Sequence, residues 1–211
     1  MSRKREQELK YRLPRRADFL ELRDGARWGP RSEPELQVNH YFDTAESRLL
    51  RSRILLRIRE VKGTFVLTIK FGREVRPGYF DSLELEAEIE RGLALAAASE
   101  PDALLRSPLE PIAELLRRTG PLQLISVGRL TNERVRREAA GHVLEVDRMQ
   151  FPDGSESHEL EIETEDAAGA AEWIQGEAAR AGLLLEPMSL TKLEQLLAWR
   201  RARLPDPHGG P

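Results

Sequence analysis

The chain has 211 residues, of which 40% are hydrophobic and 33% charged, with a formal net charge of −3. That length allows one large domain or two small ones with a real hydrophobic core. Cysteine is absent, which excludes disulfides, thiolate-bound zinc, iron–sulfur clusters and thiol catalysis. The 33 basic and 36 acidic residues nearly balance, so net charge gives no reason to expect nucleic-acid binding. No apolar run reaches the length of a membrane span, and we expect a soluble cytoplasmic protein.

Period-two alternation of side chains predicts several strands in the first half of the chain. The first runs from Glu6 to Leu13 and ends at Pro14, because proline has no backbone N–H to donate to a neighbouring strand. The other strands of this half are predicted at 36–42, 54–59 and 65–70. Between the strands we expect a helix at 17–27, a loop at 29–34, a capped helical turn at 43–50, a hairpin turn at 62–63 and a basic loop at 72–78.

The second half of the chain mixes strands with helices. Residues 80–90 alternate most sharply, with apolar side chains between glutamates at positions 84, 86, 88 and 90. Residues 92–119 are rich in alanine and leucine and interrupted by prolines, which predicts two or three short helices. Further strands are predicted at 122–137, 143–149 and 158–163, helices at 166–182 and 190–204, and a disordered tail at 205–211. About eight mostly antiparallel strands with few long helices indicate an α+β fold.

Acidic and basic side chains occupy different strands. Carboxylates are stacked near 6–12, 84–90 and 159–163, whereas cations gather near 53–59, at 70, near 129–136 and around 192. In one arrangement the charged faces lie in solvent, where cross-strand ion pairs contribute only about 0–1 kcal/mol each. In the other, the sheet closes into a barrel with its charged faces inward and helices on its apolar outside. That interior is costly when dry but tolerable if it is wet and takes up a ligand and a metal ion. The pattern alone favours the first arrangement, with the charged faces in solvent.

A series of short motifs follows in order along the chain. The first is E-x-E-x-K, formed by Glu6, Glu8 and Lys10 at the N-terminus. The others are Y-F-D-T at 41–44, L-R-I-R at 56–59, L-T-I-K at 67–70, a strand with spaced Asn and Arg at 128–134, an acidic hairpin at 144–147 and 159–163, and S-x-x-K at 189–192. This ordered set resembles the CYTH domain, or triphosphate tunnel metalloenzyme, superfamily, over about residues 4–200.

The resemblance implies a closed antiparallel eight-stranded β-barrel, a tunnel with a polar interior and helices packed outside, in one domain over residues 1–204. It therefore favours the inward arrangement of the charged faces. It implies a metal-dependent hydrolase that cleaves the terminal phosphoanhydride of inorganic triphosphate or a related small triphosphate. Thiamine triphosphatase and class IV adenylate cyclase are alternatives within the same fold. A non-catalytic polyphosphate- or nucleotide-binding module is an alternative of another class, although a pure anion binder has no use for stacked glutamates.

The resemblance also assigns roles to individual residues. Cations that would hold phosphate oxygens are Lys10, Arg57, Arg59, Lys70, Arg134, Arg136 and Lys192. Carboxylates that would bind Mg²⁺ or Mn²⁺ are Glu6, Glu8, Asp147, Glu159 and Glu161. The catalytic residues would be Glu8, Lys10 and Lys70, with Lys10 contacting phosphate or orienting the attacking water. The expected partner is a small anionic triphosphate, with no nucleic acid and no membrane, and the protein would be a monomer or homodimer.

Several of these residues have a purely structural alternative. Glu6 and Glu8 could belong to a solvated edge strand that discourages aggregation. Arg57 and Arg59 could form cross-strand ion pairs with Glu86 and Glu88 of the 84–90 strand. Within that strand the family pattern often has an arginine ahead of a spaced glutamate pair, and this chain has none there. The inward-facing glutamates are therefore undecided, with Glu86 and Glu88 as possible site residues.

Overall fold

The computed structural model describes residues 1–203, so the predicted tail at 205–211 and residue 204 lie outside the described residues. In chain order its elements are β1 (Ser2–Arg12), α1 (Arg16–Asp24), the 3-10 turn η1 (Ala26–Trp28), β2 (Glu35–Asp43), α2 (Arg48–Arg51), β3 (Ile54–Val61), β4 (Thr64–Arg76), β5 (Tyr79–Ile89), α3 (Arg91–Ser99), η2 (Pro101–Ala103), α4 (Glu110–Thr119), β6 (Ile125–Ala139), β7 (His142–Gln150), β8 (Glu156–Glu163), α5 (Ala167–Ala181), β9 (Glu186–Pro187) and α6 (Lys192–Arg201). No helix within residues 1–203 is both long enough and apolar enough to cross a membrane.

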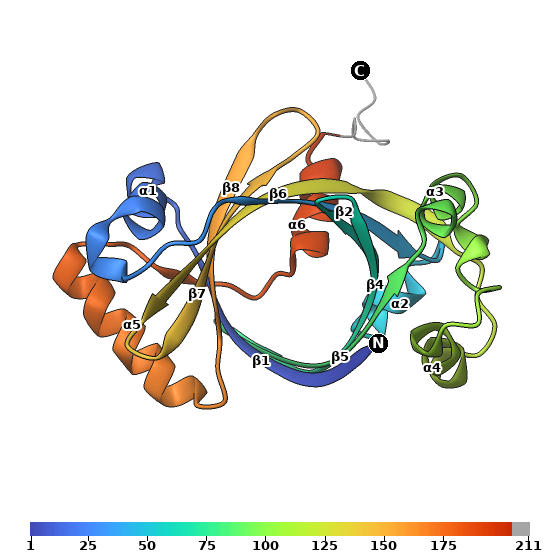
Figure 1. Ribbon diagram of the computed structural model, residues 1–211, viewed down its shortest axis with the longest axis horizontal. Coiled ribbons are helices and arrows are strands. Elements are labelled where there is room, and N and C mark those ends of the chain that lie inside the picture. Colours follow the sequence, from blue (N-terminus) through green and yellow to red (C-terminus); the bar gives the residue numbers. More distant parts are fainter. Residues whose placement is uncertain (204–211) are drawn as a thin grey trace, which may run out of the picture.

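Strands β1 to β8 close into an antiparallel barrel, which Figure 1 shows as a ring seen along its bore. The order around the ring is β5-β4-β3-β2-β6-β7-β8-β1, and β1 also pairs with β5, so the sheet has no free edge between them. Within β1, Glu8 is opposite Phe80 of β5 on one side and Glu163 of β8 on the other. The short β9 pairs with the end of β1. The predicted eight-stranded closed barrel of an α+β fold is thus confirmed.

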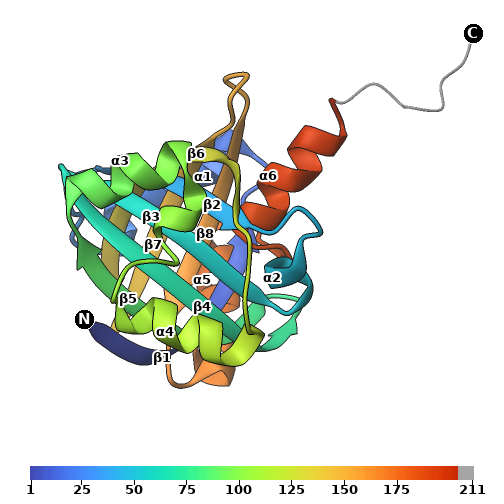
Figure 2. The same ribbon diagram turned by 90° about the vertical axis from the view of Figure 1, so that its right-hand side faces the viewer.

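The apolar faces of the strands point out of the barrel and are covered by helices. Leu56, Leu67 and Leu85, from β3, β4 and β5, belong to a buried cluster completed by side chains of α3 and α4. On the other side, α1 and α5 cover β1, β7 and β8 in a second cluster. Each fully buried leucine stabilises the fold by roughly 1.5–3 kcal/mol relative to an exposed one. The helices cover the apolar faces from outside (Figures 1 and 2). The alternate faces of the strands therefore line the bore.

At one end of the barrel the inward-facing side chains change from polar to apolar. Tyr41 follows Asn39 on β2, and Met149 follows Asp147 on β7, two positions along the same face in each case. Tyr41 and Met149 join a third buried cluster with Leu193 and Leu196 of α6; its other members are Val127 and Leu130. The start of α6 is fixed by a capping box between Thr191 and Glu194. Helix α6 therefore packs into this end of the barrel.

Several turns and caps form where the local sequence predicts them. Lys62 and Gly63 form the β3–β4 turn with φ of 49° and 83°, the left-handed pair that a two-residue hairpin requires. Asp43 accepts hydrogen bonds from the backbone N–H groups of Thr44 and Leu49, at 2.7 and 2.8 Å. These caps turn the chain out of β2 and into α2, as the Asp-Thr step predicted.

The prediction of a basic loop at 72–78 was wrong for most of its length. Strand β4 continues to Arg76, because Glu74, Val75 and Arg76 pair with the start of β5 beyond an irregularity at 72–74. The turn itself is only the Pro77-Gly78 step, with φ of +78° at Gly78. A closed barrel needs long strands of this kind. The charged end of β4 lacks the alternating apolar residues by which a strand is recognised in a sequence. Smaller differences are a first helix that ends at Asp24, a sixth strand that starts at 125, and a last helix that starts at 192.

Candidate active site

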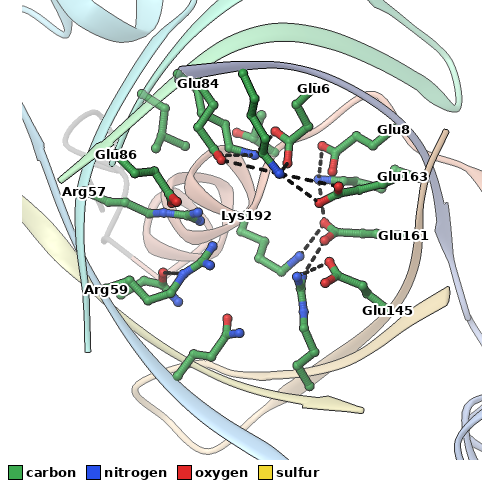
Figure 3. A pocket seen from close by; sticks show the side chains of 18 of the residues that line it. Glu6, Glu8, Arg57, Arg59, Glu84, Glu86, Glu145, Glu161, Glu163 and Lys192 are labelled. Atoms are coloured by element: carbon green, nitrogen blue, oxygen red, sulfur yellow. Dashed lines mark hydrogen bonds and ion pairs between the residues drawn. The ribbon is translucent and has the colours of Figure 1, made fainter. Parts of the chain in front are cut away.

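The bore of the barrel holds a charged cavity of about 240 Å³. Figure 3 shows Arg57 and Arg59 on one side of it, Glu8, Glu145 and Glu161 on the other, and Lys192 between them. The lining comes from all eight barrel strands and from the start of α6. Its residues are Lys4, Glu6, Glu8, Lys10, Gln37, Asn39, Tyr41, Leu55, Arg57, Arg59, Lys70, Glu84, Glu86, Arg134, Arg136, Glu145, Glu161, Glu163, Thr191 and Lys192. The charged faces of the strands therefore look at one another across the bore.

Lys10 of β1 lies between two carboxylates. Its Nζ is 3.3 Å from Oε1 of Glu8 and 2.8 Å from Oε1 of Glu161, the residue opposite it on β8. The ammonium also lies 4.8 Å from the centre of the Phe80 ring, a cation–π contact. Burial alone would lower the pKa of Lys10, but Glu161 and Glu8 raise it above its ordinary value, so the side chain stays charged. Burial, on the other hand, raises the pKa of Glu8, and Lys10 only partly opposes this.

A second group of charges joins β1, β4 and β5. Lys70 Nζ pairs with Glu6 and lies 3.1 Å from Oε2 of Glu84. Burial works to raise the pKa of Glu6, but the Lys70 ammonium overcomes it and holds that pKa at about 2. Glu6 therefore remains ionised at neutral pH, and the Lys70 ammonium balances its charge.

The register of β5 decides which glutamates of the 84–90 strand enter the bore. Glu84 is opposite Lys70 and Glu86 is opposite Thr68, whose hydroxyl donates to Glu86 at 3.0 Å. Both glutamates line the cavity. Glu88 shares their face but lies exposed near the end of β5, outside the cavity. Of the two possible site residues in this strand, only Glu86 is therefore placed in the bore.

The acidic hairpin of β7 and β8 forms a compact carboxylate cluster. Asp147, Glu159 and Glu161 each offer an oxygen within 4.8 Å of the others, and all three are buried. Lys192 Nζ lies 2.9 Å from Asp147, 2.8 Å from Glu159 and 2.5 Å from Glu161. Burial favours the neutral acid at Asp147, but Arg134 and Lys192 lower its pKa to about 2. We call these three carboxylates the acidic cluster.

Arg134 of β6 serves the acidic cluster as well. Its Nε and one terminal nitrogen donate to the two oxygens of Asp147 at 2.7 and 2.6 Å, and the same terminal nitrogen lies 2.5 Å from Glu161. The other terminal nitrogen pairs with Glu145. Arg136, two positions along, lies nearer the solvent and donates to Glu145 at 3.0 Å. The donors of Arg134 are therefore directed at carboxylates, whereas a phosphate role had been expected for it.

Arg57 and Arg59 of β3 lack such partners. Within residues 1–203 neither forms an ion pair, so the alternative of pairing with the 84–90 glutamates does not hold. Arg57 is 6% exposed and its buried Nε has no hydrogen-bond partner. Arg59 makes one long contact, 3.4 Å to Asn39. Burial, together with the neighbouring Arg57 and Arg134, lowers the pKa of Arg59 to about 10. The nearby carboxylates of Glu84 and Glu86 oppose this fall in the pKa in part, although within residues 1–203 neither lies within ion-pair distance of the two arginines.

Some cavity residues were not assigned a role from the sequence. Glu145 and Glu163 lie two positions before and after assigned carboxylates, on the same strand faces. Lys4 likewise extends the inward row of β1 by one step. Extending the alternating pattern of each strand by two residues would have identified these three cavity residues. The neutral Gln37 and Asn39 carry no such signal, because amides are common on any strand face.

The acidic cluster has donor chemistry that suits a hard divalent cation. Carboxylate oxygens are the ligands that Mg²⁺ and Mn²⁺ prefer, and three of them converge here from β7 and β8. Glu8 adjoins the cluster through the shared ammonium of Lys10. Glu6 stands apart from it, paired with Lys70. The five carboxylates proposed as ligands are thus divided between two neighbouring groups along the bore.

The depressed pKa of Glu6 predicts how stability responds to acid. Ionised Glu6 stabilises the fold above its ordinary pKa of 4.5, and this contribution is lost as pH falls toward the folded-state value of about 2. The Glu6→Gln variant should therefore be less stable than wild type at pH 6, with a difference that narrows by pH 3. Urea unfolding across this pH range measures it, and exposed Glu165→Gln is the control. An equal difference at pH 6 and pH 3 would contradict the assignment.

Comparison with known proteins agrees with this geometry. The family model described as CYTH domain matches residues 4–190. "Putative triphosphatase YjbK" of Bacillus subtilis (strain 168) is 30% identical over 148 residues, 70% of this chain and 69% of that one. The structure resembles that of HpAC1 from Hippeastrum, a "putative adenylyl cyclase" with a dominant triphosphatase activity, at TM-score 0.80 and 24% identity over 95% of this chain and 97% of that chain. It also resembles a "putative adenylate cyclase" from Bacillus halodurans, at TM-score 0.77 and 24% identity over 92% and 98% of the two chains. The chain belongs to the CYTH domain family.

Proposed function

We propose that this protein is a metal-dependent triphosphatase that cleaves the terminal phosphoanhydride of inorganic triphosphate or a related small triphosphate. The observation that carries the proposal is the pair Arg57 and Arg59, which line the cavity and form no ion pair within residues 1–203, while carboxylates of β1, β7 and β8 lie on the opposite side of the bore. A buried guanidinium without a partner is costly, and an anionic ligand removes that cost. Arginine also holds phosphate oxygens in bidentate geometry.

The cations divide into two kinds in this proposal. Arg57 and Arg59 form no ion pair within residues 1–203, so they can bind the substrate without first releasing a carboxylate. Lys10 and Lys70 are held by carboxylates but still line the cavity, so a phosphate can share their ammonium groups. Arg136 lies at a more exposed position and would contact a distal phosphate. Phosphoryl transfer depends mainly on positioning and charge neutralisation, which an array of this kind supplies.

The carboxylates would supply the metal site. Mg²⁺ or Mn²⁺ would be held by the acidic cluster with Glu8, and Glu6 would contribute from its own group. A bound ion would neutralise charge on the phosphates and lower the pKa of a bound water. Glu8 has its pKa raised by burial, and it would orient the attacking water together with Lys10. An anion-binding module without catalysis would gain nothing from these carboxylates, since they repel its ligand.

The relatives support the same reaction class. YjbK carries the name of a triphosphatase, and a dominant triphosphatase activity is described for HpAC1. A cytoplasmic location, a monomeric or homodimeric state and a single domain over residues 1–204 remain predictions alongside this function.

The first test is hydrolysis of tripolyphosphate. With Mg²⁺ or Mn²⁺, wild type should release orthophosphate, and Lys10→Ala should abolish the release. Arg57→Met should lower kcat/KM by about 10- to 100-fold, because charge-assisted hydrogen bonds to phosphate are lost. The control is Arg129→Met, an exposed arginine of β6 that does not line the cavity. A wild type that hydrolyses no triphosphate with either metal would refute the proposal.

An organic triphosphate is a second candidate substrate, favoured by an apolar vestibule beside the charged cavity. A hollow of about 280 Å³ shares Glu8, Leu55, Lys70 and Thr191 with the cavity. Its apolar lining comes from distant parts of the chain, namely Leu50, Ile54, Leu55, Val75, Phe80 and Leu193. A thiamine or adenosine group could lie there while its phosphates reach the charged bore, as thiamine triphosphatase or class IV adenylate cyclase activity would require.

Substitution at the rim of the vestibule separates the two candidates. Val75 is 36% exposed, so Val75→Ser should fold normally. If organic triphosphates are bound there, the variant should lose about three- to tenfold in kcat/KM for thiamine triphosphate or ATP while keeping its rate on tripolyphosphate. Val143→Ser, at 41% exposure on β7, is the matched control. Equal effects on all three substrates would argue against an organic-group pocket.

A further inference from the structure

Lys192 lies at the centre of the acidic cluster. Its ammonium contacts Oδ2 of Asp147, Oε2 of Glu159 and Oε1 of Glu161, all at 2.9 Å or less. These three oxygens come from the same carboxylates that together could hold a divalent cation. Lys192 is 7% exposed, and Figure 3 shows its side chain reaching into the bore from α6. A protein cation thus fills the position that suits a metal ion.

Helix α6 holds the ammonium in this place. Lys192 is the first residue of the helix, directly after the N-cap Thr191, whose capping box with Glu194 fixes the start of the helix. Leu193 is buried against the apolar end of the bore, and Gln195, on the next turn, donates a hydrogen bond to Glu159. The packing of α6 therefore fixes the position of Lys192, which distinguishes it from a flexible surface lysine.

The charges around the acidic cluster are already close to balance. Glu145 and the three cluster carboxylates face the cations Lys10, Arg134 and Lys192. A divalent ion added to this group would lie within a few ångströms of three buried positive charges. At the effective dielectric of a protein interior such repulsion is strong. The carboxylate oxygens that Lys192 uses would also have to be released to the ion.

We propose that Lys192 is the built-in occupant of the acidic cluster, and that its ammonium and a divalent cation exclude each other there. The protein then keeps its buried carboxylates paired when no ion is bound. Lys192 also lines the cavity, so its ammonium can turn to the water of the bore when an ion takes its place. This inference concerns ion binding alone and holds whatever the substrate is.

The test is a titration of the protein with Mn²⁺ alone, followed by the electron paramagnetic resonance signal of the free ion. Lys192→Met removes the charge and keeps an unbranched side chain that is only one atom shorter. This variant should bind one Mn²⁺ at least about tenfold more tightly than wild type, because a buried positive charge beside the ion is gone. Lys62→Met, in the exposed β3–β4 turn, is the matched control and should bind as wild type does.

Two further variants test whether the gain in Mn²⁺ affinity comes from the acidic cluster. Adding Glu159→Gln to Lys192→Met should abolish the gain in Mn²⁺ affinity, because one cluster carboxylate is lost. Lys192→Gln, which retains a hydrogen-bond donor for the cluster, should show the same gain as Lys192→Met and serves if the latter does not fold. Unchanged affinity in folded Lys192 variants, or a gain that survives Glu159→Gln, would overturn the proposal. The titration contains no triphosphate, so its result can be interpreted even if the protein has no triphosphatase activity.

Discussion

The fold depends on pairing buried charges of opposite sign across neighbouring strands. A carboxylate or ammonium inside a barrel is strongly destabilising unless a partner lies within a few ångströms. Here cross-strand neighbours provide the partners: Lys10 meets Glu161 on the adjacent strand, and Lys70 meets Glu84. A shift of one residue in either register would turn these side chains to opposite faces and leave unpaired charges buried. The charged interior thus specifies the register as strictly as an apolar core would.

The helices make this inside-out arrangement possible. They cover the outward apolar faces of the strands on two sides of the ring, and these clusters supply the hydrophobic stabilisation that the bore cannot (Figure 1). Because the hydrophobic contacts that stabilise the fold lie outside the barrel, the interior can hold water and a ligand. Two places in it stand out. Arg57 and Arg59 form no ion pair within residues 1–203, and the carboxylates of the acidic cluster are held at close range by lysine and arginine. These places are where an anion and a cation would enter.

Much of this architecture was predictable from the sequence. Period-two rows located all eight barrel strands, although β4 continues to Arg76 from its predicted end at 70. The order of motifs such as E-x-E-x-K selected the inward arrangement of the charged faces. Cross-strand register was not predictable in the 84–90 strand, where four equally spaced glutamates look alike until pairing with β4 places Glu84 and Glu86 in the bore. The vestibule was missed because Leu50, Phe80 and Leu193 are distant in sequence and meet only in the closed barrel. The position of Lys192 in the acidic cluster depends on how α6 packs, which no local pattern encodes.

The proposed function depends on Arg57 and Arg59, which form no ion pair within residues 1–203, binding an anionic phosphate chain. The most direct measurement is the ¹⁵N spectrum of the arginine Nε–H groups, titrated with the hydrolysis-resistant analogue imidotriphosphate in the presence of Mg²⁺. Signals of Arg57 and Arg59, assigned from their lysine variants, should shift until the site is saturated, while that of exposed Arg129 stays in place. Shifts confined to exposed arginines, with Arg57 and Arg59 unmoved at saturation, would contradict the account.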